Sequence, residues 1–419
     1  MNKNIKQIYA TFEICENELR ILIAEHFNTR FNILRIDRKT TKAVNDFRII
    51  DKQMLLDDIK ALFRESSAKL GASIEQVILV LPAYNFKRFP LRSKIITDNG
   101  IIAKKDIARS ISNSLKATVD FDVMTVNAVI NKYTINGISS RRMPEKEACD
   151  ELYVDIDLLC ADKEICYSYV SVLEEAGIKV IDIVLNTYAV GKEASLIEES
   201  LKQNVVCLDI KRSCTYLSLY SKGKLISTEI LYDGLKTIAD KIKVKHSVPD
   251  SDLYKLIKYS LDYNSEYQDD IIYAYNQTEE TKTITMKELN DLALEPLNTI
   301  SDNLVAMCKP IIDQGAMLYV TGEGQQMKCL LDLIEEKANC LIKSYYPETI
   351  GVKDSTLMAL YGSLFVYKDK VDLNNLNVNC INLLEYDSHV SSKSVDSEGE
   401  TITTKIKNLF KQYVQKEDN

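Results

Sequence analysis

Apolar and polar positions alternate along residues 5–36, in the segments IYATFEI, ELRILIAEHF and RFNILRI. Alternation with a period of two, broken by polar turns, predicts consecutive antiparallel strands. Residues 52–70 change to helical spacing, and the run QVILVLPAY (76–84) is then apolar almost throughout. Such a run is typical of a strand that is buried on both faces of a sheet. Three strands, a helix and a buried strand indicate an α/β domain.

The same order of elements returns after residue 200. NVVCLDI (204–210), TYLSLYSKG (215–223) and KLISTEILYDG (224–234) read as three strands, and a helix follows from about Leu235. After a Tyr-rich stretch, AMLYVTGEG (316–324) reads as a buried strand that enters a glycine turn. Two such halves predict an internally duplicated α/β fold with a ligand cleft between them. Two unrelated α/β domains are the alternative.

A further unit lies between the two halves. Residues 103–115 have the spacing of an amphipathic helix, whereas 130–137 and 151–164 look like strands. Residues 166–185 read as a helix that ends at Gly177, followed by a strand. This unit of roughly 80–90 residues is large enough to pack as a small subdomain.

The C-terminal part changes character. Residues 388–400 are Ser-rich and without periodicity, which predicts a flexible linker. Residues 401–416 return to helical spacing with lysines mainly outside the apolar face, as in a helix that lies in a membrane interface. A helix that docks back on the folded body is the alternative. The residues expected at the membrane are Ile402, Lys405, Ile406, Lys407, Leu409, Phe410, Lys411, Tyr413 and Val414.

Composition excludes several functions. A chain of 419 residues suggests two or three domains, and a net charge of -8 argues against a general nucleic-acid binder. Three histidines far apart in sequence, and ten cysteines without a C-x-x-C pair, favour neither a metal site nor a hydrolase. We therefore expect no catalytic residue and no metal. The chain lacks a secretory h-region and an apolar run of ~18 residues, which predicts a reduced, cytoplasmic protein.

The turns that follow the predicted strands are the candidates for phosphate binding. Glu13 lies in the first turn, and the second holds Asp209, Ser213 and Thr215. Neither turn contains the glycine that would let backbone N–H groups approach a phosphate, so ordinary polar hairpins are equally compatible. The third turn keeps two glycines before a helix, at Gly322 and Gly324.

Five segments together carry a family resemblance. YTING (133–137) looks like Y-x-V-D-G, LEEAGIKVIDIV (173–184) like a helix-to-strand segment EAGL-x-V, and LMALYGSLFVY (357–367) like a closing helix. Residues 207–234 follow a phosphate strand pair in which D-I-G-G-G-T-T-D corresponds to residues 209–216, and YVTGEGQQM (319–327) is similar to the adenosine motif L-T-G-G-G. In this order and spacing, the chain resembles the bacterial cell-division family FtsA over about residues 7–367 plus the C-terminal helix.

The resemblance implies a fold. It is the actin/Hsp70-like duplicated ATPase fold with an inserted subdomain in each half, followed by a flexible linker and a C-terminal amphipathic helix. The implied parts are 1–84 and 171–200 (subdomain 1A), 85–170 (inserted subdomain 1C), 201–244 and 306–371 (subdomain 2A), 245–305 (subdomain 2B), 372–400 (linker) and 401–416 (membrane helix).

The resemblance also implies an ATP site with Mg, but the two phosphate loops depart from the family. Cys15 and Glu16 stand in a loop where the family has D-I-G-T-S, while Lys211 and Arg212 replace glycines and Tyr216 replaces an acid. We therefore predict a degenerate site at which ATP binds weakly or not at all and is hydrolysed negligibly. Retained nucleotide binding is the alternative. Its residues would be Glu13, Asp209, Ser213, Thr215, Gly234, Thr321, Gly322 and Gly324.

The partners implied by the resemblance are the C-terminal tail of FtsZ, an anionic membrane surface, other division proteins and further copies of the chain in actin-like filaments. The protein would tether FtsZ filaments to the cytoplasmic face of the membrane at the division site. Residues 245–305 would receive the tail in a groove between two helices that flank a polar loop, through Lys255, Lys258 and Tyr259. A PilM-like scaffold for pilus assembly, and a phosphotransferase such as a sugar kinase, are the alternatives of the same fold.

Overall fold

The structure of the protein is a computed structural model. It describes residues 6–27, 30–277, 280–347, 353–374, 376 and 378–397. The predicted membrane helix at 401–416 lies outside these residues. Within them, no helix combines the length and the apolar character that crossing a membrane requires.

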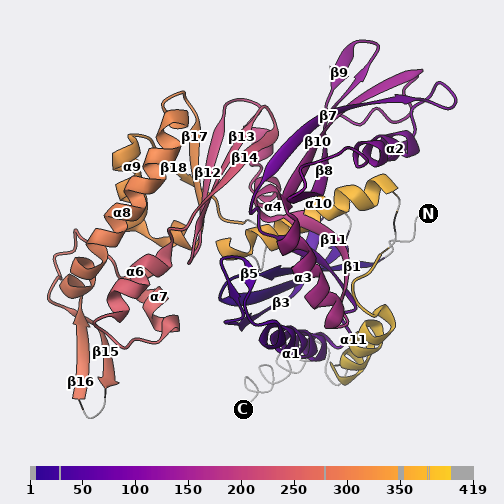
Figure 1. The fold of residues 1–419 in the computed structure, drawn as a ribbon. Coiled ribbons are helices and arrows are strands. Elements are labelled where there is room, and N and C mark those ends of the chain that lie inside the picture. Colours follow the sequence, from indigo (N-terminus) through magenta and orange to yellow (C-terminus); the bar gives the residue numbers. More distant parts are fainter. Residues whose placement is uncertain are drawn as a thin grey trace, which may run out of the picture.

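The first half is built on a five-stranded sheet in the order β11-β6-β1-β2-β3 (Figure 1). Its strands are β1 (Gln7–Ile14), β2 (Glu18–Phe27), β3 (Arg30–Thr40), β6 (Gln76–Leu81) and β11 (Lys179–Leu185). β1, β2 and β3 are antiparallel neighbours, whereas β6 runs parallel to β1 and β11. The predicted helix is α1 (Lys52–Leu70), and it is preceded by a small hairpin of β4 (Val44–Asn45) and β5 (Arg48–Ile49).

The second half repeats this arrangement in a sheet of order β14-β13-β12-β17-β18. The strands are β12 (Val205–Ile210), β13 (Thr215–Ser221), β14 (Lys224–Leu231), β17 (Met317–Gly322) and β18 (Ile342–Ser344). Three antiparallel strands again adjoin parallel ones. The helices of this half include α6 (Leu235–Lys243), α8 (Met286–Ile312) and α9 (Lys328–Ala338). The matching topology confirms the internal duplication that the sequence predicts.

Two helices pack closely near the junction of the halves. α4 (Asn186–Glu193) precedes the short α5 (Leu196–Glu199) and lies against α10 (Met358–Asn374), which follows the 3-10 turn η2 (Ser355–Leu357). Gly362 permits this crossing, because a Cβ atom there would lie 2.0 Å from the carbonyl oxygen of Ala189. α4 also contacts the second half, since the Tyr220 hydroxyl donates to the carbonyl of Thr187 at 2.6 Å.

The inserted subdomain of the first half forms a separate four-stranded sheet in the order β7-β10-β8-β9. It comprises β7 (Lys87–Ile96), α2 (Lys104–Ser114), β8 (Val123–Ile135), β9 (Ile138–Ser140) and β10 (Glu151–Asp162), with its own small core. The next helix, α3 (Lys163–Glu175), packs into the core of the first half beside α1. The insertion therefore ends near residue 162 and not at the predicted boundary of 170.

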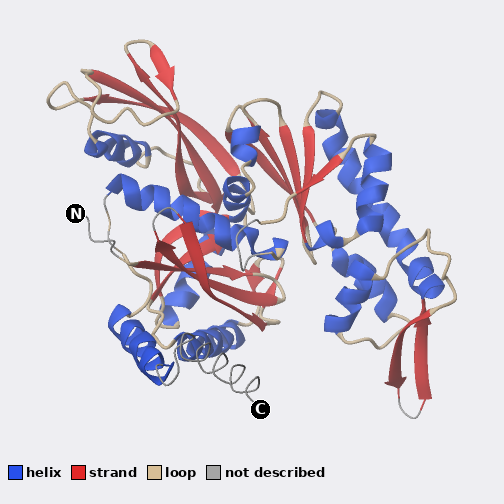
Figure 2. Ribbon diagram, turned by 180° about the vertical axis from the view of Figure 1, so that it is seen from behind, coloured by secondary structure: helices blue, strands red, loops and turns tan. Residues whose placement is uncertain are grey.

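The second insertion, predicted at 245–305, contains α7 (Asp250–Tyr259), β15 (Ile271–Gln277), β16 (Glu280–Thr285) and the first part of α8. The expected polar loop between two helices is instead a protruding antiparallel hairpin of β15 and β16 (Figures 1 and 2). Alternating threonines suit this hairpin.

The segment predicted as a flexible linker, 372–400, is structured over much of its described length. α10 extends to Asn374, and α11 spans Leu383–Ser397. Between them, Cys380 and Ile381 are buried in the core of the first half. The linker prediction was therefore wrong for residues 378–391. Two buried apolar side chains and backbone hydrogen bonds attach this segment to the first half, and neither leaves a periodic pattern in the sequence.

Candidate functional site

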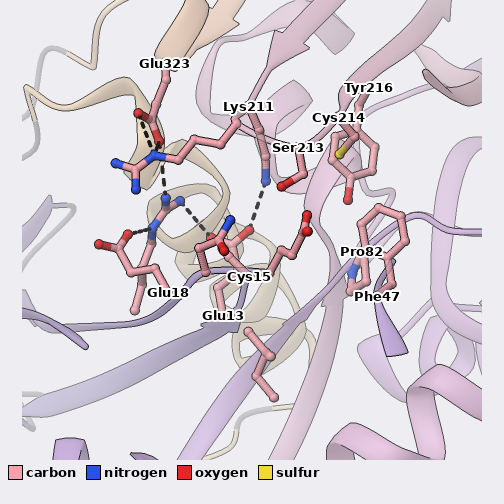
Figure 3. Close-up of a pocket in the computed structure, with 15 residues that line it drawn as sticks. Glu13, Cys15, Glu18, Phe47, Pro82, Lys211, Ser213, Cys214, Tyr216 and Glu323 are labelled. Atoms are coloured by element: carbon pink, nitrogen blue, oxygen red, sulfur yellow. Dashed lines mark hydrogen bonds and ion pairs between the residues drawn. The ribbon is translucent and has the colours of Figure 1, made fainter. Parts of the chain in front are cut away.

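Two hairpin turns face one another in the cleft between the halves (Figure 3). The turn after β1 carries residues 15–17, and the turn after β12 carries residues 211–214. The 3-10 turn η1 (Glu323–Gln326), directly after β17, forms a third side. The sequence predicts phosphate binding at these turns, and the structure does bring them together.

Charged side chains fill this cleft. Four carboxylates and four cations at the cleft are linked by ion pairs and are here called the cleft network: Glu13, Glu18, Arg20, Asp209, Lys211, Arg212, Lys258 and Glu323. From Glu18 the ion pairs continue to Arg38 and Asp354. The formal charges of the cleft network cancel. Phosphate sites use backbone N–H groups, cationic side chains or a bound metal ion, and the charges of this network leave no surplus of cationic side chains for one.

The network joins the two halves directly. Nζ of Lys211 lies 3.1 Å from a carboxylate oxygen of Glu13, and Arg20 of β2 lies 3.9 Å from Glu323 of η1. A further pair at the edge of the cleft, Lys236 with Glu16 at 3.6 Å, also crosses from one half to the other. The chain therefore holds its own cleft together with ion pairs.

Glu323 pairs with more cations than any other carboxylate of the cleft network. Its carboxylate lies 2.9 Å from Arg212, 3.6 Å from Lys258 and 3.9 Å from Arg20, and the residue is only 3% exposed. The residue-by-residue analysis of the sequence missed it. The available signal was its position, because Glu323 stands where the motif L-T-G-G-G has its middle glycine.

Burial and neighbouring charges set the ionisation of the network. Burial alone would raise the pKa of Glu13, but Lys211 and Arg20 lower it below its usual value. Burial raises the pKa of Asp209 although Lys211 opposes the shift. Burial would lower the pKa of Lys211, but Glu13 and Asp209 raise it. Glu13 and Lys211 therefore face each other as an ion pair at neutral pH.

Little space is left between the turns. The cavity has a volume of about 60 Å³, whereas sites for small-molecule ligands usually hold about 300–1,000 Å³. Figure 3 shows Phe47, Pro82 and Tyr216 on the side opposite Glu323. Tyr216 is buried there, with Nζ of Lys211 5.1 Å from its ring centroid. These side chains narrow the cleft between the two turns.

The glycines of the predicted nucleotide site are occupied in packing. Gly322 has φ +79°, and a Cβ atom there would lie 2.5 Å from both Oδ1 of Asp209 and the carbonyl oxygen of Ile210. A Cβ atom at Gly324 would meet the Ile210 side chain at 2.5 Å, and one at Gly234 would lie 2.4 Å from the carbonyl oxygen of Arg212. A backbone carbonyl close to Gly322 and Gly234, and the Ile210 side chain close to Gly324, are enough to require glycine at these positions.

Some of the other predicted nucleotide residues lie in the cleft, and others are bonded within the protein. Asp209 and Glu13 both lie in the cleft network, and Ser213 lines the cavity. The hydroxyl of Thr215 donates to the carbonyl of Asp233 at 2.8 Å, and Thr321 is buried against Met358. The two threonines therefore have partners within the protein. A role of the whole set in nucleotide binding stays a prediction.

The three predicted partner residues lie on α7 but point in different directions. Tyr259 is 66% exposed, and its hydroxyl donates to Gln326 of η1 at 2.9 Å. Lys255 is exposed and pairs with Asp252 at 3.2 Å. Lys258 turns inward to Glu323. Only Lys255 and Tyr259 thus present much of their side chains to a partner.

The described ranges contain no group of three or more His, Cys, Asp or Glu side chains that could hold a metal ion. The ten cysteines are all free thiols.

Solved structures with a similar fold define the class of this protein. The PilM–PilN type IV pilus biogenesis complex matches with a TM-score of 0.55 and 12% identity, covering 86% of this chain and 98% of that chain. MreB5 of Spiroplasma citri bound to ADP matches with a TM-score of 0.52 and 11% identity, covering 88% and 99%. The chain therefore has the actin-like ATPase fold, as the sequence predicts.

Sequence comparison adds a narrower relationship. Cell division protein FtsA of Bacillus subtilis (strain 168) is 21% identical over 372 residues, which cover 86% of this chain and 83% of that protein. FtsA of Staphylococcus epidermidis (strain RP62A) is 20% identical over 418 residues, covering 93% and 85%. No family model matches. The chain is a divergent relative of FtsA, and the resemblance identified from its motifs is confirmed.

The network generates a stability prediction. Replacing Glu323 by Gln removes a buried carboxylate from the buried Arg20 and from the half-buried Arg212 and Lys258, and removing one partner of a buried ion pair costs about 3–5 kcal/mol. We expect the denaturant midpoint of E323Q to fall clearly. Glu295→Gln is the matched control, because Glu295 is exposed and pairs with Lys241 at 2.6 Å on the surface. Equal midpoints for the two variants would contradict a structural role of the network.

Proposed function

We propose that this protein is an FtsA-like adaptor in cell division that attaches FtsZ filaments to the cytoplasmic face of the membrane without using a nucleotide cycle. The observation that carries the nucleotide-free part is the neutral cleft network, which occupies the space between the two phosphate turns. The similarity to FtsA supports the cell-division part. The chain would act by binding, with self-association and other division proteins as further contacts.

The alternatives of the same fold are less well supported. The likeness to the PilM–PilN complex extends to the fold alone, at 12% identity, whereas the named sequence relatives are FtsA proteins. A phosphotransferase must position phosphate and metal closely. A cavity of about 60 Å³ lined by Lys211, Arg212 and Glu323 offers no room for that.

Calorimetric titration with Mg-ATP tests the nucleotide-free cleft. We expect weak or no binding and negligible phosphate release from the wild-type protein, because Glu13 and Glu323 already neutralise the cations. Sub-micromolar affinity or steady turnover would refute this. Glu323→Gly restores the glycine of the family motif and releases Arg212, Arg20 and Lys258, so its affinity for ATP should rise relative to wild type. A bulky residue at Gly322 should then abolish that gain.

Liposome flotation tests the membrane anchor. Each lysine near an anionic leaflet contributes roughly 1 kcal/mol, so the lysines of 402–414 together with its apolar face should give a reversible anchor. Full-length protein should float with vesicles that contain phosphatidylglycerol, whereas protein truncated before Thr401 should stay at the bottom. Phe410→Glu should weaken flotation without loss of the folded body. Equal flotation of full-length and truncated protein would reject the anchor.

Fluorescence anisotropy with the tail peptide of the organism's own FtsZ tests the partner. A few anchors dominate interfaces of this kind, so Tyr259→Ala should weaken binding strongly. Lys258→Ala should do so as well, although this change also removes the contact to Glu323. Lys309→Ala is the matched control, because Lys309 is a half-exposed lysine at a distant position of α8 that also pairs with one acid, Asp313. No binding to wild type, or unchanged binding after Y259A and K258A together, would exclude this site.

A further inference from the structure

A further cavity lies where three parts of the chain meet (Figure 1). The inserted sheet contributes β8 and β10 to its walls, the first half contributes α4 and α5, and the second half contributes the turn between β13 and β14. The cavity has a volume of about 100 Å³, and none of its lining residues belongs to the cleft network. A ligand held here would touch the insertion and both halves at once.

Asn131 of β8 brings a buried amide without a partner to this cavity. The residue is only 4% exposed, and its Nδ2 atom has no hydrogen-bond partner within the described chain. Its neighbours Ile130 and Lys132 lie opposite consecutive residues of β10, which leaves Asn131 as the extra residue of a β-bulge. Bulges re-aim a side chain. A buried donor that lacks a hydrogen bond destabilises the fold, so this amide calls for a partner that the protein itself does not supply.

The charged groups around the cavity leave an excess of positive charge. Its lining carries three cations and two acids: Arg141, Lys192, Lys224, Asp157 and Glu198. Asp157 is buried and pairs with Arg88 at 3.2 Å, whereas Glu198 is exposed to water. Lys192 pairs with Asp369 at 3.0 Å. With these two outer partners included, four cations stand against three acids. The cavity thus differs from the cleft, where the charges cancel.

The second-half wall of the cavity is fixed by both other parts. The guanidinium of Arg141, which follows β9, donates to the carbonyls of Lys222 at 3.2 Å and Gly223 at 2.8 Å. The N–H of Gly223 donates to the hydroxyl of Ser200 at 2.9 Å. Because the turn is bonded to the insertion and to the first half, the next residue, Lys224, is held at the cavity.

We propose that this cavity binds a small oxyanion of the phosphate type, held by Asn131 and Lys224 between the inserted sheet and the second half. One water needs about 10–15 Å³ of such a volume, so the cavity of about 100 Å³ has room for the four oxygens of a tetrahedral ion. Ligands of drug size usually need about 300–1,000 Å³.

The donors at the cavity suit such an ion. The amide of Asn131 and the ammonium of Lys224 offer N–H groups, and hydrogen bonds between a cation and an oxyanion are stronger than neutral ones. Tyr188 of α4 also lines the cavity, and burial raises the pKa of its hydroxyl to about 12. That hydroxyl therefore keeps its proton at neutral pH and can donate. The bound ion would offset the excess positive charge and fix the insertion against the second half.

Equilibrium dialysis of the full-length protein against radiolabelled inorganic phosphate tests the site, with the ionic strength held constant by chloride. We expect saturable uptake of a single ion per chain. Lys224→Gln should weaken the affinity roughly ten-fold or more, because it removes a charged hydrogen-bond donor. Lys222→Gln is the matched control, since Lys222 belongs to the same turn but is exposed and does not line the cavity. Its affinity should equal that of the wild type.

Asn131→Leu separates a ligand site from a purely structural role of this residue. Leucine has about the shape of asparagine but no polar group, so it removes the unpaired donor without opening a hole. This variant should lose phosphate uptake, while its denaturant midpoint in phosphate-free buffer should equal or exceed that of the wild type. A clear fall of that midpoint would overturn the proposal, because it would mean that the amide already has a partner in the fold.

Two further results would overturn the proposal. Absence of saturable uptake by the wild type would leave the cavity to water, and equal affinities of the wild type, K224Q and N131L would place the ion elsewhere. A parallel titration with glycerol 3-phosphate identifies the source of the anion. Inorganic phosphate should bind at least as tightly if the ligand is the free ion. Tighter binding of the ester would instead assign the same site to the phosphoryl group of a larger molecule that enters beside the exposed Arg141.

Discussion

Neutralisation of charge inside the cleft is the constraint on which the rest of the structure depends. Buried charged groups such as Glu13, Arg20 and Glu323 are tolerated only when an opposite charge lies in contact with each. The members of the cleft network come from β1, β2, the turn after β12, η1 and α7. Their pairing therefore fixes both halves and the second insertion relative to one another. In this chain, oppositely charged side chains bridge the turns on the two sides of the cleft.

Backbone packing reinforces the same arrangement. Gly322 lets β17 turn against Asp209 at the base of the network, and Gly362 lets α10 cross α4 at close range. Neither contact leaves room for a side chain: Gly322 packs against β12, the neighbouring strand of its own sheet, and Gly362 packs α10 on α4 at the junction of the halves. The retained glycines are thus explained by the protein's own packing, and their presence is not by itself an argument for a nucleotide.

Much of the fold could be predicted from the sequence, because the two five-stranded sheets are indicated by period-two alternation and by buried apolar runs. The cleft network could not, since a single acid such as Glu323 in a polar turn resembles any exposed residue. Its cation partner Arg20 lies some three hundred positions away, and only the tertiary fold brings them together. The attachment of residues 378–382 and α11 to the first half was missed for a similar reason. Backbone hydrogen bonds and the short apolar pair Cys380 and Ile381 leave no periodic trace in a Ser-rich segment.

The position of α7 connects the cleft to the outer surface. Consecutive residues on this helix serve both sides: Lys258 reaches Glu323, while Tyr259 is exposed and bonds to Gln326 in the same turn η1. An acidic partner that touches Tyr259 would compete with Glu323 for Lys258, since both offer a carboxylate to one ammonium group. Any gain for the partner would then leave Glu323 with fewer cations and weaken the pairing between the halves. An acidic partner at this position would therefore act on the cleft through the charge of Lys258.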